Sequence, residues 1–104
     1  MNANAASKAL KIKMAAIVAI KIRIMPVSTE TNLEEIRKEA EKRIIQLEGR
    51  MHSSEIEPIA FGLKALIIIL AWPEVKNPDL IENAMSGIEG VESAEIIDVR
   101  RASF

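Results

Sequence analysis

The chain has 104 residues, a formal net charge of −1 and no cysteine, and only 3% of its residues are aromatic. A chain of this length supports one hydrophobic core and therefore one domain. The absence of cysteine excludes a disulfide framework and any thiolate nucleophile or metal ligand. The near-neutral charge and the scarcity of aromatic rings argue against nucleic-acid binding, which uses basic patches and base stacking.

Residues 1–13 show no sustained hydrophobic period, and we interpret them as a disordered N-terminal extension to a single domain at residues 14–104. The longest apolar runs, at residues 14–20 and 65–72, are shorter than the roughly 18–20 residues of a membrane span. We therefore expect a cytoplasmic protein that does not contact a membrane.

The first predicted element is a strand that begins at Ala16. Its residues alternate between apolar and polar, which indicates a strand with one buried face, and Pro26 ends it. The buried side is expected to carry Val18, Ile20, Ile22 and Ile24, and the other side Ala19, Lys21 and Arg23.

A helix follows, with two equally good starts. Thr31 with Glu34 and Asn32 with Glu35 both match a capping box, and Gly49 is expected to end the helix. Acid-first pairs four residues apart, Glu34 with Lys38 and Glu39 with Arg43, predict a solvated outer face. The inner face is expected to carry Leu33, Ile36, Ala40, Ile44 and Leu47.

The second half of the chain predicts strand, strand, helix, strand. Residues 52–59 are polar and contain Pro58, which is typical of an edge strand, whereas residues 63–72 are apolar on both faces, which is typical of a central one. A helix begins around Asn77 and Pro78 and ends at Gly87 or Gly90. Residues 91–101 form the last strand, which is more polar than the first and third.

The predicted order is therefore β-α-β-β-α-β. Right-handed crossovers in both halves place both helices on one face of a four-stranded antiparallel sheet, with strands one and three in the middle. This is the α+β, ferredoxin-like sandwich.

The residues offer little chemistry for an enzyme. His52 is the single histidine, and the four glycines are too scattered for a phosphate loop. Glu55 and Glu57 share a face but form only a weak cation site, so solvated edge carboxylates are the better interpretation. RNA readout on this fold would need aromatic residues on the central strands, where Trp72 stands alone. We expect no enzymatic reaction, no metal site and no cofactor.

Residues 57–66, Glu-Pro-Ile-Ala-Phe-Gly-Leu-Lys-Ala-Leu, are unusual for a turn between an edge strand and a central strand. Such turns are generally polar, yet this one places apolar residues around Gly62. One interpretation is that Phe61 caps the core and Gly62 supplies an unusual backbone angle. The other is a loop that presents an aromatic anchor and the Lys64 cation to a partner.

This stretch resembles the signature of the translation elongation factor 1-beta family. Residues 18–26 resemble the first strand of that family, and residues 88–101 resemble the last helix turn and strand of its archaeal branch. The resemblance covers residues 14–101 and implies a ferredoxin-like fold. It also implies guanine nucleotide exchange on the GTPase elongation factor 1-alpha without covalent chemistry. A monomer is expected, with weak dimerisation as the alternative.

The resemblance implies a partner-binding loop from Glu57 to Lys64. Phe61 would be the apolar anchor, Gly62 the backbone joint and Lys64 a contact for acidic groups, while Pro58 and Ile59 would shape the loop. Eukaryotic relatives also use a basic residue near the carboxyl terminus at the magnesium site, and this chain has no lysine in its tail. Arg100 and Arg101 are the candidates for that role, with solvation of an edge strand as the other interpretation. Lys21 and Arg23 are candidate contacts on the open face of the sheet.

Three other functions remain open at this point. A small-molecule-sensing regulatory module of the same fold would need a glycine in the turn after the first strand, and residues 25–29 contain none. An assembly module would pair its edge strands between chains. An acylphosphatase-like enzyme is compatible with the fold alone, which is a poor guide to function.

Overall fold

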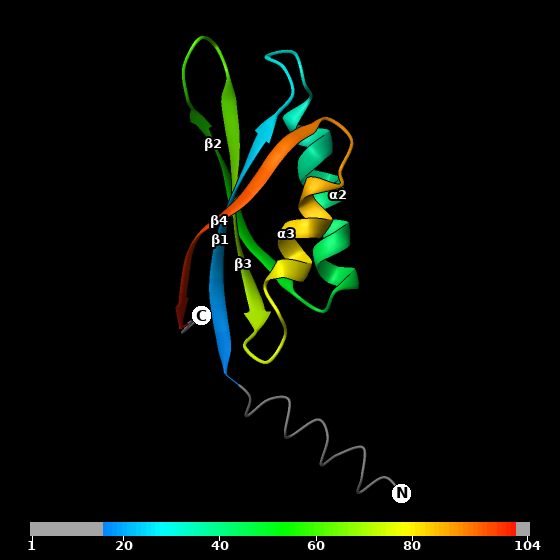
Figure 1. Cartoon of the computed structure of the whole chain (residues 1–104), viewed down its shortest axis with the longest axis vertical. Coiled ribbons are helices and arrows are strands. Elements are labelled where there is room, and N and C mark those ends of the chain that lie inside the picture. Colours follow the sequence, from blue (N-terminus) through cyan, green and yellow to red (C-terminus); the bar gives the residue numbers. More distant parts are fainter. Residues whose placement is uncertain (1–15, 102–104) are drawn as a thin grey trace, which may run out of the picture.

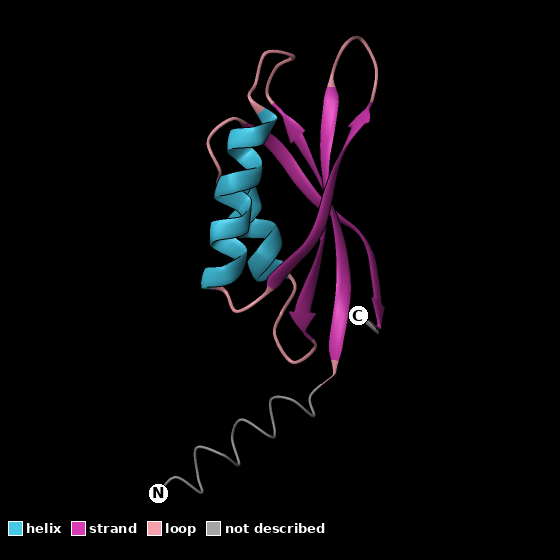
Figure 2. Ribbon diagram, turned by 180° about the vertical axis from the view of Figure 1, so that it is seen from behind, coloured by secondary structure: helices cyan, strands magenta, loops and turns pink. Residues whose placement is uncertain are grey.

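Six elements follow one another in the predicted order β-α-β-β-α-β in the computed structural model, which describes residues 16–101. The sheet has four antiparallel strands in the order β2-β3-β1-β4. Both helices pack on one face of the sheet, as Figure 2 shows. This arrangement confirms the α+β, ferredoxin-like prediction; the predicted extension at residues 1–13 lies outside the described residues. The elements are β1 (Ile17–Pro26), α2 (Leu33–Gln46), β2 (Arg50–Pro58), β3 (Lys64–Pro73), α3 (Asp79–Ser86) and β4 (Val91–Arg101) (Figure 1).

The core lies between the sheet and the two helices. Alternate residues of β1 point into it, as their period predicted, and α2 contributes a stripe of residues three to four positions apart. β3 is buried on both faces over residues 65–68, which explains its unbroken apolar run. The side chains with no exposed surface include Ile20, Ile22, Ile24, Ile44, Ile68, Leu70, Trp72, Ile81 and Met85.

The start of α2 is set by Asn32 and not by Thr31. The Asn32 side chain accepts hydrogen bonds from the backbone N–H groups of Glu34 (3.0 Å) and Glu35 (3.2 Å). The neighbouring Thr31 hydroxyl instead accepts from the backbone N–H of Ser28 at 3.2 Å. The structure therefore settles which of the two predicted residues caps the helix.

The prediction that Gly49 ends α2 is wrong. The helix ends at Gln46, with Leu47 as its cap, and Glu48 rather than Gly49 adopts the left-handed backbone with φ of 73°. Gly49 is required for space, because a Cβ there would lie 3.0 Å from Trp72 Cε3 and 3.1 Å from the carbonyl oxygen of Ala71. The glycine thus lets the chain pass close to the buried indole.

The second helix begins within one residue of its predicted start. α3 starts at Asp79, whose backbone N–H donates to Asn77 Oδ1 at 2.9 Å, and Gly87 caps its end. Glu82 on this helix accepts the backbone N–H of Ile96 at 2.9 Å, beside a break in the β1–β4 register. The Glu82 carboxylate thus provides a hydrogen-bond acceptor for a backbone N–H of β4 beside the bulge.

Candidate partner-binding site

The loop predicted to bind a partner forms a tight hairpin tip between β2 and β3. The last paired residues are Pro58 and Lys64, and the backbone N–H of Leu63 donates to the carbonyl oxygen of Ala60 at 2.9 Å. Phe61 and Gly62 are the two central residues of this turn, with φ of 55° and 83°. Two successive positive φ angles are the signature of a type I′ turn, which matches the twist of a hairpin.

Phe61 is almost fully exposed at this tip, with 98% of its surface accessible. The interpretation in which Phe61 caps the core is therefore wrong. The unusual angle predicted for Gly62 is confirmed, but Phe61 shares it, and a bulky residue with positive φ is a genuine outlier. The first central position of a type I′ turn favours Asn, Asp or Gly, so the chain holds an aromatic ring in solvent at a cost in backbone energy.

Further apolar side chains are exposed around the tip. Ile59 is 44% exposed, and Ile56 and Val27, on the strand and loop beside it, are more than half exposed. Ile59 lines a shallow hollow with Met25 and the Arg23–Glu95 pair. Pro58, Glu57 and Lys64 are exposed at the base of the hairpin. The structure thus brings the predicted loop residues together on one apolar, charge-flanked end of the molecule.

Arg100 and Arg101 lie at the opposite end of the sheet. They pair with Ala19 and Val18 at the start of β1, whereas the hairpin begins beyond Ile24. Six residue steps along β1 from Val18 to Ile24 separate the two ends by roughly 20 Å. The structure therefore does not join the predicted site residues into one site. The arginines contact acids of their own chain, Arg100 with Asp98 at 2.7 Å and Arg101 with Glu74 at 3.8 Å.

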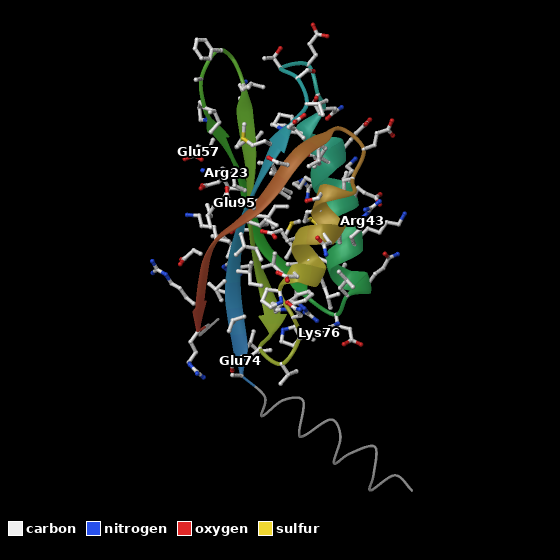
Figure 3. The ribbon with its side chains drawn as sticks, viewed as in Figure 1. Arg23, Arg43, Glu57, Glu74, Lys76 and Glu95 are labelled. Atoms are coloured by element: carbon white, nitrogen blue, oxygen red, sulfur yellow. The ribbon has the colours of Figure 1, made fainter. Side chains whose placement is uncertain are left out.

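The face of the sheet away from the helices carries the other two candidates. Arg23 forms an ion pair with Glu95 at 3.0 Å, and Lys21 stands opposite Asp98 on β4. Figure 3 shows the labelled Arg23, Glu95 and Glu57 together on this side, and Glu74 toward the other end of the sheet. Lys21 and Arg23 therefore face acidic groups of the same chain.

The groups considered for catalysis are not assembled into a site. His52 is exposed on β2, and Trp72 is fully buried on the helix side with its indole N–H donating to the carbonyl oxygen of Lys76 at 3.1 Å. Residues 16–101 contain no group of three or more His, Cys, Asp or Glu side chains that could hold a metal ion. Within the same residues, no helix is long and apolar enough to cross a membrane.

One neighbour of the tip carried no signal in the sequence. Thr29, in the loop between β1 and α2, lies beside Gly62, although more than thirty residues separate them along the chain. In the sequence, the hydroxyl-bearing residues from Ser28 to Thr31 indicate only the start of a helix. Only the placement of the two loops reveals that the residues are neighbours.

Comparison with known proteins identifies the family. Residues 19–102 match the family described as "EF-1 guanine nucleotide exchange domain". A protein named elongation factor 1-beta from Sulfolobus acidocaldarius is 41% identical over 90 residues, which cover 84% of this chain and 98% of the relative. A protein of the same name from Methanothermobacter thermautotrophicus is 41% identical over 86 residues, covering 81% of this chain and 94% of the relative. One from Methanosarcina barkeri is 42% identical over 86 residues, covering 81% and 96%. The chain belongs to the EF-1 guanine nucleotide exchange domain family, and its role is in nucleotide exchange during translation elongation.

Proposed function

We propose that this chain binds the GTPase elongation factor 1-alpha and promotes release of GDP and reloading with GTP, with Phe61 as the anchor of the contact. The observation that carries the site is Phe61 itself, an aromatic side chain held 98% exposed on a left-handed backbone. A sequence under selection for stability alone would place Asn or Gly at that position. Buried aromatic anchors are the residues that dominate binding energy at protein interfaces.

The surroundings of Phe61 fit the same role. Ile59 and Ile56 extend the apolar surface, and Lys64 and Glu57 place one charge of each sign at its edge. An apolar centre with a charged rim is the usual anatomy of a protein–protein interface. Arg100 and Arg101, at the other end of the sheet, are proposed as a second contact on the same GTPase.

No covalent step is required of the chain. An exchange factor that weakens GDP binding by a given ratio is itself bound more weakly, by the same ratio, when GDP is present. The complex of factor, GTPase and GDP is therefore short-lived and resolves by nucleotide release. The work is done by contact with the GTPase, which agrees with a site made of an aromatic ring, a turn and surface charges.

The test is the release of a fluorescent GDP analogue from an archaeal elongation factor 1-alpha, with and without this chain. We expect strong acceleration by the wild type and its loss in Phe61→Ala, which removes an exposed ring and leaves the core intact. Circular dichroism confirms that the variant is folded. Acceleration that persists in Phe61→Ala would refute the site, and a folded wild type that does not accelerate release would refute the function.

A further inference from the structure

The face of the sheet that the helices leave uncovered, here called the open face, has two halves of opposite charge (Figure 2). Residues paired across an antiparallel sheet lie on the same face, so the register places each charged side chain. The half next to the β2–β3 hairpin has a net charge of −2, from Glu55, Glu57, Glu95 and Arg23. The half next to the start of β1 and the end of β4 has a net charge of +2, from Lys21, Arg50, Arg100 and Asp98.

The central strand β3 carries no charge on the open face. It lies between β2 and β1, and its side chains on this face are Ala65, Ile67, Ile69 and Ala71. Ile69 and Ala71 keep part of their surface accessible, whereas Ala65 and Ile67 are buried beneath the side chains around them. The open face thus has an apolar strip with charges on both sides of it, which is the layout of an interface core with a polar rim.

Two charges at the ends of β2 have no partner of opposite charge in their own chain. Glu57 lies opposite Ala65 and Arg50 lies opposite Ala71, so six residue steps along β3 separate them, or roughly 20 Å. Among residues 16–101, neither Glu57 nor Arg50 forms an ion pair. Both side chains are exposed. A carboxylate and a guanidinium therefore stand on one edge of the open face, too far apart to reach each other.

We propose that the open face binds the open face of a second copy of this chain. A two-fold axis that crosses the strands between the two halves places the −2 half of each copy over the +2 half of the other. β2 of one copy then lies antiparallel over β2 of the other, with Arg50 over Glu57. Because a two-fold interface is self-complementary, this contact occurs twice. The inference goes beyond the proposed function and does not depend on it.

The size of the open face predicts a weak dimer. Residues 65–71 of β3 span about 23 Å and the four strands cover about 19 Å, which gives roughly 440 Å² per copy and roughly 900 Å² for the dimer. Stable interfaces bury about 1,200–2,000 Å², so this association belongs to the weak, transient class. Salt screens exposed charges over about 10 Å at 0.1 M, so added salt should dissociate the dimer.

Sedimentation velocity of the full chain, at low salt and up to millimolar concentration, tests the proposal without the GTPase. We expect a reversible dimer whose dissociation constant rises about tenfold in Arg50→Glu and in Glu57→Arg, because each substitution turns both symmetric contacts from attraction into repulsion. An equimolar mixture of the two variants should associate as the wild type does. In a mixed dimer, both contacts between positions 50 and 57 again join opposite charges.

Lys42→Glu is the matched control, because it makes the same change of charge as Arg50→Glu at an exposed position on α2. It should leave the dissociation constant unchanged, and an equal weakening would show that net charge and not the open face controls association. A wild type that stays monomeric would overturn the proposal, as would a mixture that does not associate. A monomeric wild type beside loss of nucleotide exchange in Arg50→Glu would mean that the open face binds the GTPase instead of a second copy.

Discussion

Replacing Phe61 with asparagine should make the domain more stable and less active at the same time. A residue with a Cβ pays about 1–2 kcal/mol in the left-handed region, and asparagine is one of the few side chains that tolerate it. Phe61 is 98% exposed, so its removal forfeits almost no burial in return. We therefore expect Phe61→Asn to raise the free energy of unfolding by about 0.5–1 kcal/mol, or the melting temperature by about 2–6 °C.

The same substitution removes the proposed anchor. Interface anchors of this type cost 2 kcal/mol or more when truncated, which corresponds to about a 30-fold loss in the apparent affinity for the GTPase. Urea denaturation measures the stability, and release of a fluorescent GDP analogue measures the exchange activity. Ile45→Asn is the control for exchange activity, because Ile45 is 60% exposed on α2 and belongs to neither proposed contact. It should leave the exchange activity unchanged.

Two results would refute this reasoning. A loss of stability in Phe61→Asn would mean that the positive φ is not strained, or that the ring has packing partners in solution. An unchanged exchange activity would mean that the ring is not the anchor. If Phe61 is retained for binding at a cost in stability, Phe61→Asn must raise the free energy of unfolding and lower the exchange activity.

Three further predictions concern stability. Gly49→Ala should lower the free energy of unfolding by about 1–3 kcal/mol in urea denaturation, because the added Cβ would crowd Trp72 and the Ala71 carbonyl. An unchanged urea midpoint would show that the backbone moves away from these groups without cost. Asn32→Ala should cost about 1 kcal/mol in the same assay, since it removes the cap of α2, and Asn32→Asp, which can accept the same bonds, should not. Hydrogen bonds from Arg37 and Arg43 hold the pKa of Glu34 and Glu39, respectively, below the ordinary value of 4.5. The stability that these two ionised carboxylates add is therefore present above pH 4.5 and is lost as the pH falls through their lowered pKa values. Melting curves of Glu34→Gln/Glu39→Gln should therefore depend less on pH below 4.5 than those of the wild type.

The elements of the fold were predictable because local signals and burial agree. β1 and β3 have distinct apolar patterns, and Pro26 and Pro73 stand at their ends in the structure as in the prediction. The end of α2 was not predictable in the same way. A glycine that frees the backbone angle and a glycine that makes room for a neighbour look identical in a sequence, and Gly49 is of the second kind.

The candidate site was predictable in its location and not in its geometry. The apolar turn around Gly62 stood out among polar loops, and its unusual angle was expected. The left-handed conformation of Phe61 was not, because turn statistics favour other residues there. The proximity of Thr29 to the turn depends on how two loops are placed, which no local pattern encodes. The distance between the hairpin and Arg100, by contrast, follows from the antiparallel pairing of β1 with β4.

That distance bears on how an exchange factor of this size could act. An exchange factor must bind its GTPase, and it must also weaken the binding of GDP to it. By linkage, the factor then binds the GDP-loaded GTPase more weakly than the nucleotide-free one. This linkage holds wherever the contacts lie, but separate contacts allow the affinity for the GTPase and the displacement of GDP to be set by different residues. The base of the hairpin and the arginine end are joined by β1 and lie roughly 20 Å apart, far enough for the effects of substitutions at the two ends to add independently. Under the proposed function, Phe61 at one end of the sheet holds the GTPase, and Arg100 and Arg101 at the other end supply a separate contact.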